Sequence, residues 1–169
     1  FFAAIQLAGQ LIDTQMGFGI VNVMDPLSGA PAPILGNFKY ILTMLVFLQV
    51  DGHHLLLKAL YGSYNVIPIG EFAVSDNIIR LLVSFFGEVL FTGLQLALPV
   101  VGSLLVVDIV MGIISRTVPQ MNIFMVGMPA KILFGFAVLL VTLPLFIYLL
   151  NSLIEHLFIQ LDQIMRVVL

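Results

Sequence analysis

The sequence turns polar over Arg116–Phe124, RTVPQMNIF, between two long apolar stretches that hold almost no charge. Pro119 breaks the run, so neither stretch can continue through it as a regular helix. Irregular backbone of this kind cannot lie in lipid with unpaired amide groups, and it has to face water, other protein or a cavity. The run therefore predicts a turn between two helices and is a candidate functional element.

Composition places the chain in or beside a membrane. Of its 169 residues, 61% are hydrophobic and only 9% are charged, against about 25% charged in soluble domains. The net charge of -3 is spread along the chain, so we expect no nucleic-acid partner and no polybasic lipid anchor. The absence of cysteine excludes disulfides and thiolate chemistry. Phe1 follows no initiator Met or signal sequence, so we expect the natural chain to begin earlier.

Four helical blocks are expected, and the first two are separated by a long loop. The first block covers residues 1–19, and three prolines and two glycines make residues 20–37 a loop. A second helix is expected over residues 38–64. The third and fourth blocks, residues 75–115 and 129–169, flank the polar turn.

The third and fourth blocks are too long for simple membrane spans. About 39 residues at 1.5 Å each give a helix of about 60 Å, twice the roughly 30 Å hydrocarbon core. Pro99 and Pro144 would kink the two arms. Either each arm folds back into two spans, or the pair forms a hairpin taller than an ordinary bundle.

Four acidic residues lie in or near the apolar stretches, where a charge costs about 2.5–3.5 kcal/mol to insert. One interpretation is a proton or ion relay. The alternative, which we favour, is that they pair across helices or sit in protein contacts. These residues are Asp13, Asp51, Glu88 and Asp108.

The spacing of the three histidines in the sequence does not favour a metal site. His53 and His54 are adjacent, which directs them about 100° apart on a helix, and His156 is remote in sequence. We therefore interpret them as interfacial polar residues and expect no metal and no cofactor. The sequence also contains no phosphate-binding glycine loop, GxSxG or HExxH motif, so we expect no enzyme.

Several distinctive motifs follow one another along the chain. They are QLAGQLIDTQMGFG at residues 6–19, MDP at 24–26, DGHHLL at 51–56, SY at 63–64 with IPIG at 67–70, and SRTVPQMNIFMVGMPAKI at 115–132. In this order they resemble the FliR family of flagellar biosynthesis proteins and its injectisome counterparts. The resemblance covers the whole chain and corresponds to the C-terminal two-thirds of a family member, because the family has an additional helical stretch ahead of the AGQ motif.

The resemblance implies a structural subunit of a type III secretion export gate. Such a subunit forms, with FliP-like and FliQ-like subunits, a closed helical pore for unfolded export substrates, and it contacts FlhB-like and FlhA-like components. It implies an all-α, membrane-associated fold of long kinked helical hairpins, in contact with lipid in the bacterial inner membrane at the flagellar basal body. Residues 1–73 would be FliP-like, and 74–169 a FliQ-like hairpin with its turn at about 116–129.

The resemblance also implies two sets of functional residues. The loop at about 20–37 would plug the pore through Val21, Asn22, Val23, Met24, Asp25, Pro26, Leu27, Ser28, Pro31, Pro33 and Leu35. Neighbouring subunits would be contacted by Glu88, Gln95, Asp108, Arg116, Pro119, Gln120, Asn122 and Lys131.

Two other functions remain open from the residues alone. A fragment of a secondary transporter would explain broken helices and buried acids, although it should contain an inverted repeat, and none is visible. A structural membrane anchor without a conduit would explain the apolar composition.

Overall fold

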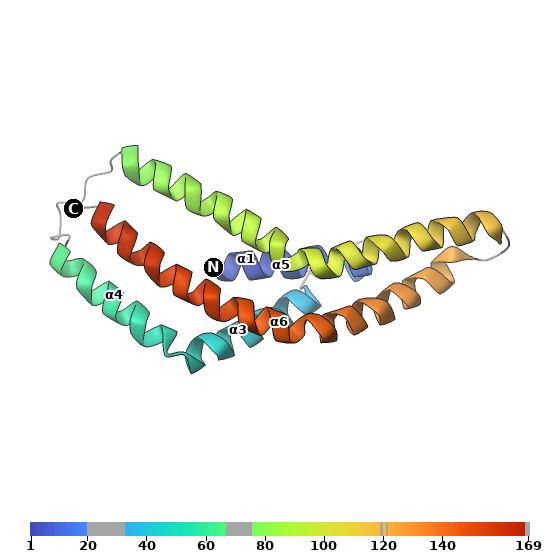
Figure 1. Ribbon diagram of the computed structural model, residues 1–169, viewed down its shortest axis with the longest axis horizontal. Coiled ribbons are helices and arrows are strands. Elements are labelled where there is room, and N and C mark those ends of the chain that lie inside the picture. Colours follow the sequence, from blue (N-terminus) through green and yellow to red (C-terminus); the bar gives the residue numbers. More distant parts are fainter. Residues whose placement is uncertain (20–32, 67–75, 119, 121, 168–169) are drawn as a thin grey trace, which may run out of the picture.

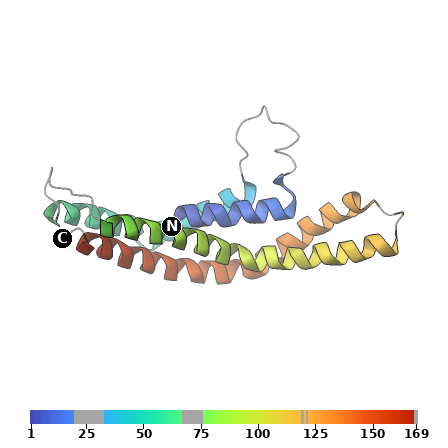
Figure 2. The ribbon, with the colours of Figure 1, turned by 90° about the horizontal axis from the view of Figure 1, so that it is seen from above.

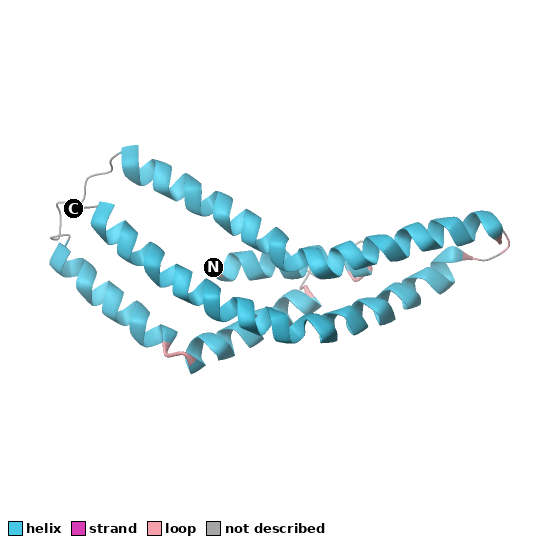
Figure 3. Cartoon of the chain, viewed as in Figure 1, coloured by secondary structure: helices cyan, strands magenta, loops and turns pink. Residues whose placement is uncertain are grey.

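The computed structural model describes residues 1–19, 33–66, 76–118, 120 and 122–167, and nearly all of these residues lie in helices (Figures 1 and 3). No strand occurs in these ranges. The helices are α1 (Phe2–Met16), α3 (Ile34–Gln49), α4 (Gly52–Val66), α5 (Asp76–Thr117) and α6 (Ile123–Val167). The expected all-α class is confirmed.

Helices α5 and α6 form one tall hairpin rather than four short spans. They contain 42 and 45 residues, which at 1.5 Å per residue gives about 63 Å and about 68 Å. Both continue through their internal prolines, Pro99 in α5 and Pro144 in α6, and both bend near their middle (Figure 1). Stretches Ile78–Thr117 and Met125–Leu161 are long and apolar enough to cross a membrane.

The expected single helix over residues 38–64 is wrong, because α3 and α4 meet at a bend of 70°. Asp51 adopts a positive φ of 56°, a left-handed conformation that no α-helix continues through. Gly52 then starts α4 against the ring of Phe47, where a Cβ atom would lie 2.4 Å from a ring carbon. The sharp turn therefore depends on the Asp51–Gly52 pair.

Two helices also begin earlier than expected. Helix α3 starts at Ile34 rather than residue 38, with Pro33 as its N-cap. Helix α6 starts at Ile123 rather than Pro129, because the carbonyl of Asn122 accepts the first hydrogen bonds, from the amides of Met125 and Val126. Pro129 therefore lies inside α6, where only one helical hydrogen bond is lost.

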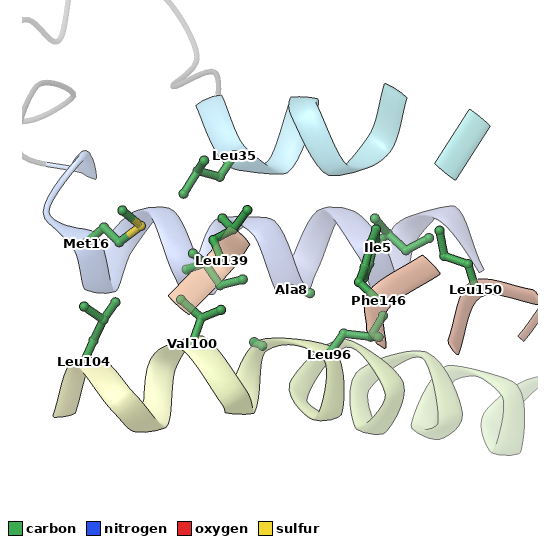
Figure 4. Close-up of a cluster of buried hydrophobic side chains, with 12 residues drawn as sticks. Ile5, Ala8, Met16, Leu35, Leu96, Val100, Leu104, Leu139, Phe146 and Leu150 are labelled. Atoms are coloured by element: carbon green, nitrogen blue, oxygen red, sulfur yellow. The ribbon is translucent and has the colours of Figure 1, made fainter. Parts of the chain in front are cut away.

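The core runs along α1, which lies in the angle between α3 and the hairpin (Figures 2 and 4). Side chains of α1 at helical spacing point into it from one face, and Leu35 of α3 joins them. Residues of α5 and α6 close it from the other side. Its fully buried members include Ile5, Ala8, Ile12, Met16, Ala97, Leu104 and Leu150.

Two glycines bring the backbones of α1 and α3 together. A Cβ atom on Gly9 would lie 2.1 Å from the Cα of Gly36 and 2.8 Å from its amide nitrogen. No side chain fits between the two backbones at that point. Because a glycine in a helix costs about 0.5–1 kcal/mol relative to alanine, this close approach is the structural reason for Gly9. At Gly36 a Cβ atom would instead lie 2.9 Å from the Cβ of Pro33.

Beside the glycine contact, α1 supplies the N-cap that α3 lacks. Pro33 makes no side-chain capping hydrogen bond, so the first amides of α3 need an acceptor from elsewhere. The buried carboxylate of Asp13 accepts the amide of Leu35 with both oxygens at 3.1 Å, and that of Gly36 at 3.1 Å. A negative charge at this end of a helix also interacts favourably with the helix dipole.

We predict that Gly9→Ala separates α1 from α3 and lowers the free energy of unfolding by about 1–3 kcal/mol, because the new methyl group overlaps backbone. Thermal unfolding of the purified protein in detergent, followed by circular dichroism, measures this loss. Gly112→Ala in α5 is the control, because nothing lies within 4 Å of its Cβ position. Equal destabilisation by both changes would contradict the backbone contact.

We predict that Asp13→Ala lowers the free energy of unfolding by about 2–3 kcal/mol, because two buried amides lose their acceptor. Asp13→Asn keeps an acceptor oxygen but not the charge, so its loss is expected to be about 1 kcal/mol. The same unfolding assay ranks the two variants. An alanine variant as stable as the wild type would show that the cap contributes nothing.

Candidate functional site

The expected plug loop is held at both ends by the same residue, Asp13. Helix α1 ends in a left-handed Gly17, with φ of 94°, and the amides of Gly17 and Phe18 donate to the carbonyls of Thr14 and Asp13 at 3.2 and 3.0 Å. This pair of bonds is the Schellman arrangement that closes many helices. The Asp13 carboxylate also caps α3. The end of α1 and the start of α3 are therefore both fixed by hydrogen bonds to Asp13.

Most of the expected plug residues lie outside the described residues. These are Val21, Asn22, Val23, Met24, Asp25, Pro26, Leu27, Ser28 and Pro31. The structure does place the last two. Pro33 is the N-cap of α3, and Leu35 is only 4% exposed and belongs to the core of the chain. The Leu35 side chain therefore packs in the core where α3 begins, at the end of the expected loop.

A polar network ties α1 to both arms of the hairpin near the same end of α1. The ammonium of Lys131 in α6 lies 2.6 Å from one oxygen of Asp108 in α5. The other oxygen of Asp108 accepts a hydrogen bond from the Gln15 amide of α1 at 2.9 Å. Since the side chains of Lys131 and Asp108 are 21% and 42% exposed, the pair is only partly shielded from its surroundings.

A second polar link joins α5 and α6 at the other end of α1. Gln160 donates a hydrogen bond to the carboxylate of Glu88. The pair lines a cavity of about 200 Å³ between α5, α6 and the first turn of α1, whose other walls include Phe85, Leu153 and His156. The cavity is mostly apolar, and its polar lining side chains include His156 as well as this pair.

Lys39 is a buried cation at the centre of the bundle. It is 4% exposed, and its ammonium lies 4.8 Å from the ring centroid of Phe146 in α6, within the range of a cation–π contact. Pro99 removes a helical donor from the carbonyl of Gln95. Lys39, Gln95 and Pro99 share a cavity of about 20 Å³, enough for one water molecule.

The remaining expected contact residues lie on the surface near the hairpin turn. Arg116 and Gln120 are exposed, as is Gln95 further along α5. Asn122 begins α6 through its carbonyl, and Pro119 is outside the described residues. The structure therefore pairs Asp108 with Lys131 and Glu88 with Gln160, whereas it leaves Arg116, Gln120 and Gln95 facing outward.

The four acidic residues all contact protein groups, as favoured from the sequence. Asp13 caps α3, Asp108 meets Lys131, Glu88 accepts from Gln160, and Asp51 lies 3.2 Å from the Nδ1 atom of His54. No chain of neighbouring acids connects them: each lies at a different junction. This arrangement suits helix packing rather than a proton relay.

The sequence pattern missed the partners of these acids. Gln15 and Gln160 were not singled out, and no spacing rule links Gln15 to Asp108, 93 residues away. One signal was available for the cap. A helix that begins after Pro33 without Ser, Thr, Asp or Asn at its N-cap needs an acceptor from another element, and Asp13 is one of the two acids that precede it in the sequence.

The outer faces of the hairpin are apolar and uncovered. Only 17% of the most apolar stretch of each arm is buried by the chain itself. Patches of this size mark contact with lipid or with other protein. On the first half of α5 the exposed large apolar residues include Ile79, Leu82, Val83, Phe86, Leu90 and Phe91.

Known proteins match this chain over most of its length. The sequence profile described as "Bacterial export proteins, family 1" matches residues 1–157. The flagellar biosynthetic protein FliR of Bacillus subtilis (strain 168) is 42% identical over 142 residues, covering 82% of this chain. Those of Pectobacterium carotovorum subsp. carotovorum and Escherichia coli (strain K12) are 33% and 31% identical over 99% and 95% of it.

The chain spans 55%, 63% and 60% of the length of these three relatives. The family profile, by contrast, matches far more than half of the chain. The motifs quoted from residues 6–19, 51–56 and 115–132 all fall inside the matched region. This chain therefore belongs to the bacterial export proteins of family 1.

Proposed function

We propose that the chain is part of a structural, non-enzymatic subunit of the flagellar type III export gate in the bacterial inner membrane, at the flagellar basal body. The observation that carries this proposal is the tall α5–α6 hairpin with its uncovered apolar faces, in a chain whose relatives are named flagellar biosynthetic protein FliR. Faces of this extent require lipid or other subunits as cover.

Within this gate, the hairpin of residues 74–169 is the FliQ-like part and residues 1–73 the FliP-like part. FliP-like and FliQ-like subunits cover the apolar faces, and FlhB-like and FlhA-like components join the assembly. The outward-facing Arg116, Gln120 and Gln95 are the polar groups best placed for such contacts. Asp108, Lys131 and Glu88 contribute by setting the distance between the two arms.

The gate works by occlusion, with the loop that follows α1 as its plug. Unfolded substrate passes along a conduit that this loop closes with apolar and methionine side chains, Met24 and Leu27 among them. The anchoring of the loop by Asp13 supports this role, because a plug has to be fixed to the wall of the conduit while its tip blocks the passage of substrate. The free energy for transport comes from the associated export machinery.

We predict that the full-length protein purifies as a large hetero-oligomer with two other small apolar proteins, because the apolar outer faces of its hairpin need other subunits to cover them. Native mass spectrometry of the intact complex measures the composition. A monomer or dimer that binds a small solute would instead indicate a transporter, and a monomer without partners or solute would indicate an anchor.

We predict that deleting residues 28–32 leaves the complex assembled but leaky to ions, because the deletion shortens the plug and spares Pro33, the N-cap of α3. Conductance of the reconstituted complex in planar bilayers checks this outcome. Deletion of residues 70–74, the same length in the segment before α5, is the control and should stay closed. A 28–32 deletion as tight as the wild type would remove the plug role while leaving the subunit assignment intact.

A further inference from the structure

Three metal-binding side chains meet at the bend between α3 and α4. Asp51, His53 and His54 each offer one ligand atom, and these atoms lie within 4.8 Å of one another. Among the residues that the structure describes, this is the one group of three or more His, Cys, Asp or Glu side chains close enough to share a metal ion. Neither the gate proposal nor the packing of the core uses them.

The three side chains converge where α4 begins, directly after the bend. Adjacent residues on a regular helix point about 100° apart, yet the rings of His53 and His54 have their centroids 4.2 Å apart. Asp51 lies just before α4 with its left-handed backbone, and its carbonyl accepts the amides of His54 and Leu55. Its carboxylate is thereby held over the first turn, 3.2 Å from His54 Nδ1.

One of the ring nitrogens has no protein partner. The Nδ1 atom of His53 is buried and makes no hydrogen bond. A buried polar atom without a partner costs about 1–3 kcal/mol, and an imidazole nitrogen in that situation is either bonded to water or coordinated to a metal. His53, which carries this nitrogen, belongs to the same group as Asp51 and His54, and the group counts one ring nitrogen of each histidine.

We propose that the α3–α4 bend binds one divalent transition-metal ion of the zinc type through Asp51, His53 and His54. Two imidazoles and one carboxylate are a ligand set for Zn²⁺ and its neighbours, whereas Ca²⁺ and Mg²⁺ prefer oxygen alone. With metal–ligand distances of about 2.0–2.2 Å, two ligands of one ion lie about 3–3.6 Å apart. Side-chain rotation closes the remaining separation.

A bound ion would act on the bend itself. Asp51 belongs to the turn after α3, whereas His53 and His54 belong to the first turn of α4, so coordination links the two helices across their 70° angle. Water occupies the remaining coordination positions, because three protein ligands leave a tetrahedral ion one position short. The histidines, which suggest no metal site as a sequence pair, gain a third ligand in Asp51, which precedes His54 by three residues at the bend.

The test is a Co²⁺ titration of the full-length, metal-free protein in detergent, with any purification tag removed, followed by the visible absorption of the bound ion. We expect saturation at one ion per chain and displacement by Zn²⁺. Asp51→Asn and His54→Gln are each expected to weaken binding by about tenfold or more. Asparagine tolerates the left-handed backbone, so the Asp51 variant keeps the bend.

His156→Gln is the matched control, because His156 is an exposed histidine in α6 outside this group. It should bind Co²⁺ as the wild type does. His53→Gln removes a ligand without touching the bend residue, and it covers the case in which Asp51→Asn fails to fold. Binding unchanged in His53→Gln and His54→Gln, or lost equally in His156→Gln, would overturn the proposal.

Discussion

A buried carboxylate from one helix completes the first turn of another, and the arrangement of α1 and α3 depends on it. Helix α3 begins after a proline that offers no cap, and Asp13 of α1 accepts the two amides that would otherwise lack partners. The same residue accepts the Phe18 amide with its carbonyl and so closes α1. The Gly9–Gly36 contact keeps the two backbones near enough for these bonds. Removing either feature therefore weakens the other.

The hairpin shows how a mostly apolar chain positions its few polar groups. Asp108 and Lys131 face each other and Gln15, Glu88 meets Gln160, and Lys39 lies over the ring of Phe146. Each contact joins different helices, so the charges hold the bundle together internally. The outer faces of α5 and α6 are left apolar, and a surface of that kind associates with lipid or with other apolar subunits. The polar contacts between helices, together with lipid or other subunits on the apolar outer faces, suit arms of about 60 Å.

The sequence predicted the helical class, the turn at residues 116–124 and the length of both arms, because these follow from local hydropathy and from helix-breaking residues. The sequence-based prediction failed where contacts between distant residues determine the helix boundaries. The bend at Asp51–Gly52 depends on the Phe47 ring, and the early start of α3 depends on Asp13, which is 22 residues away. Of the expected site residues, the pairs formed by Asp108 and Glu88 could not be read from spacing, since Gln15 and Gln160 lie 93 and 72 residues from them. Most of the expected plug residues lie outside the described ranges, so their role stays a prediction.

The Asp13 cap also constrains the order in which the chain matures during synthesis. The carboxylate emerges 22 residues before the amide of Leu35 that it binds, so the cap cannot form until that amide has been made. A lone charge is costly in hydrocarbon, so α1 without this cap favours water or the membrane interface until α3 arrives. In the joined α1–α3 pair the carboxylate is buried and hydrogen-bonded, and α5, which packs on α1, is made later still. Growth from the ribosome therefore favours docking α1 with α3 first and closing the tall hairpin over them last.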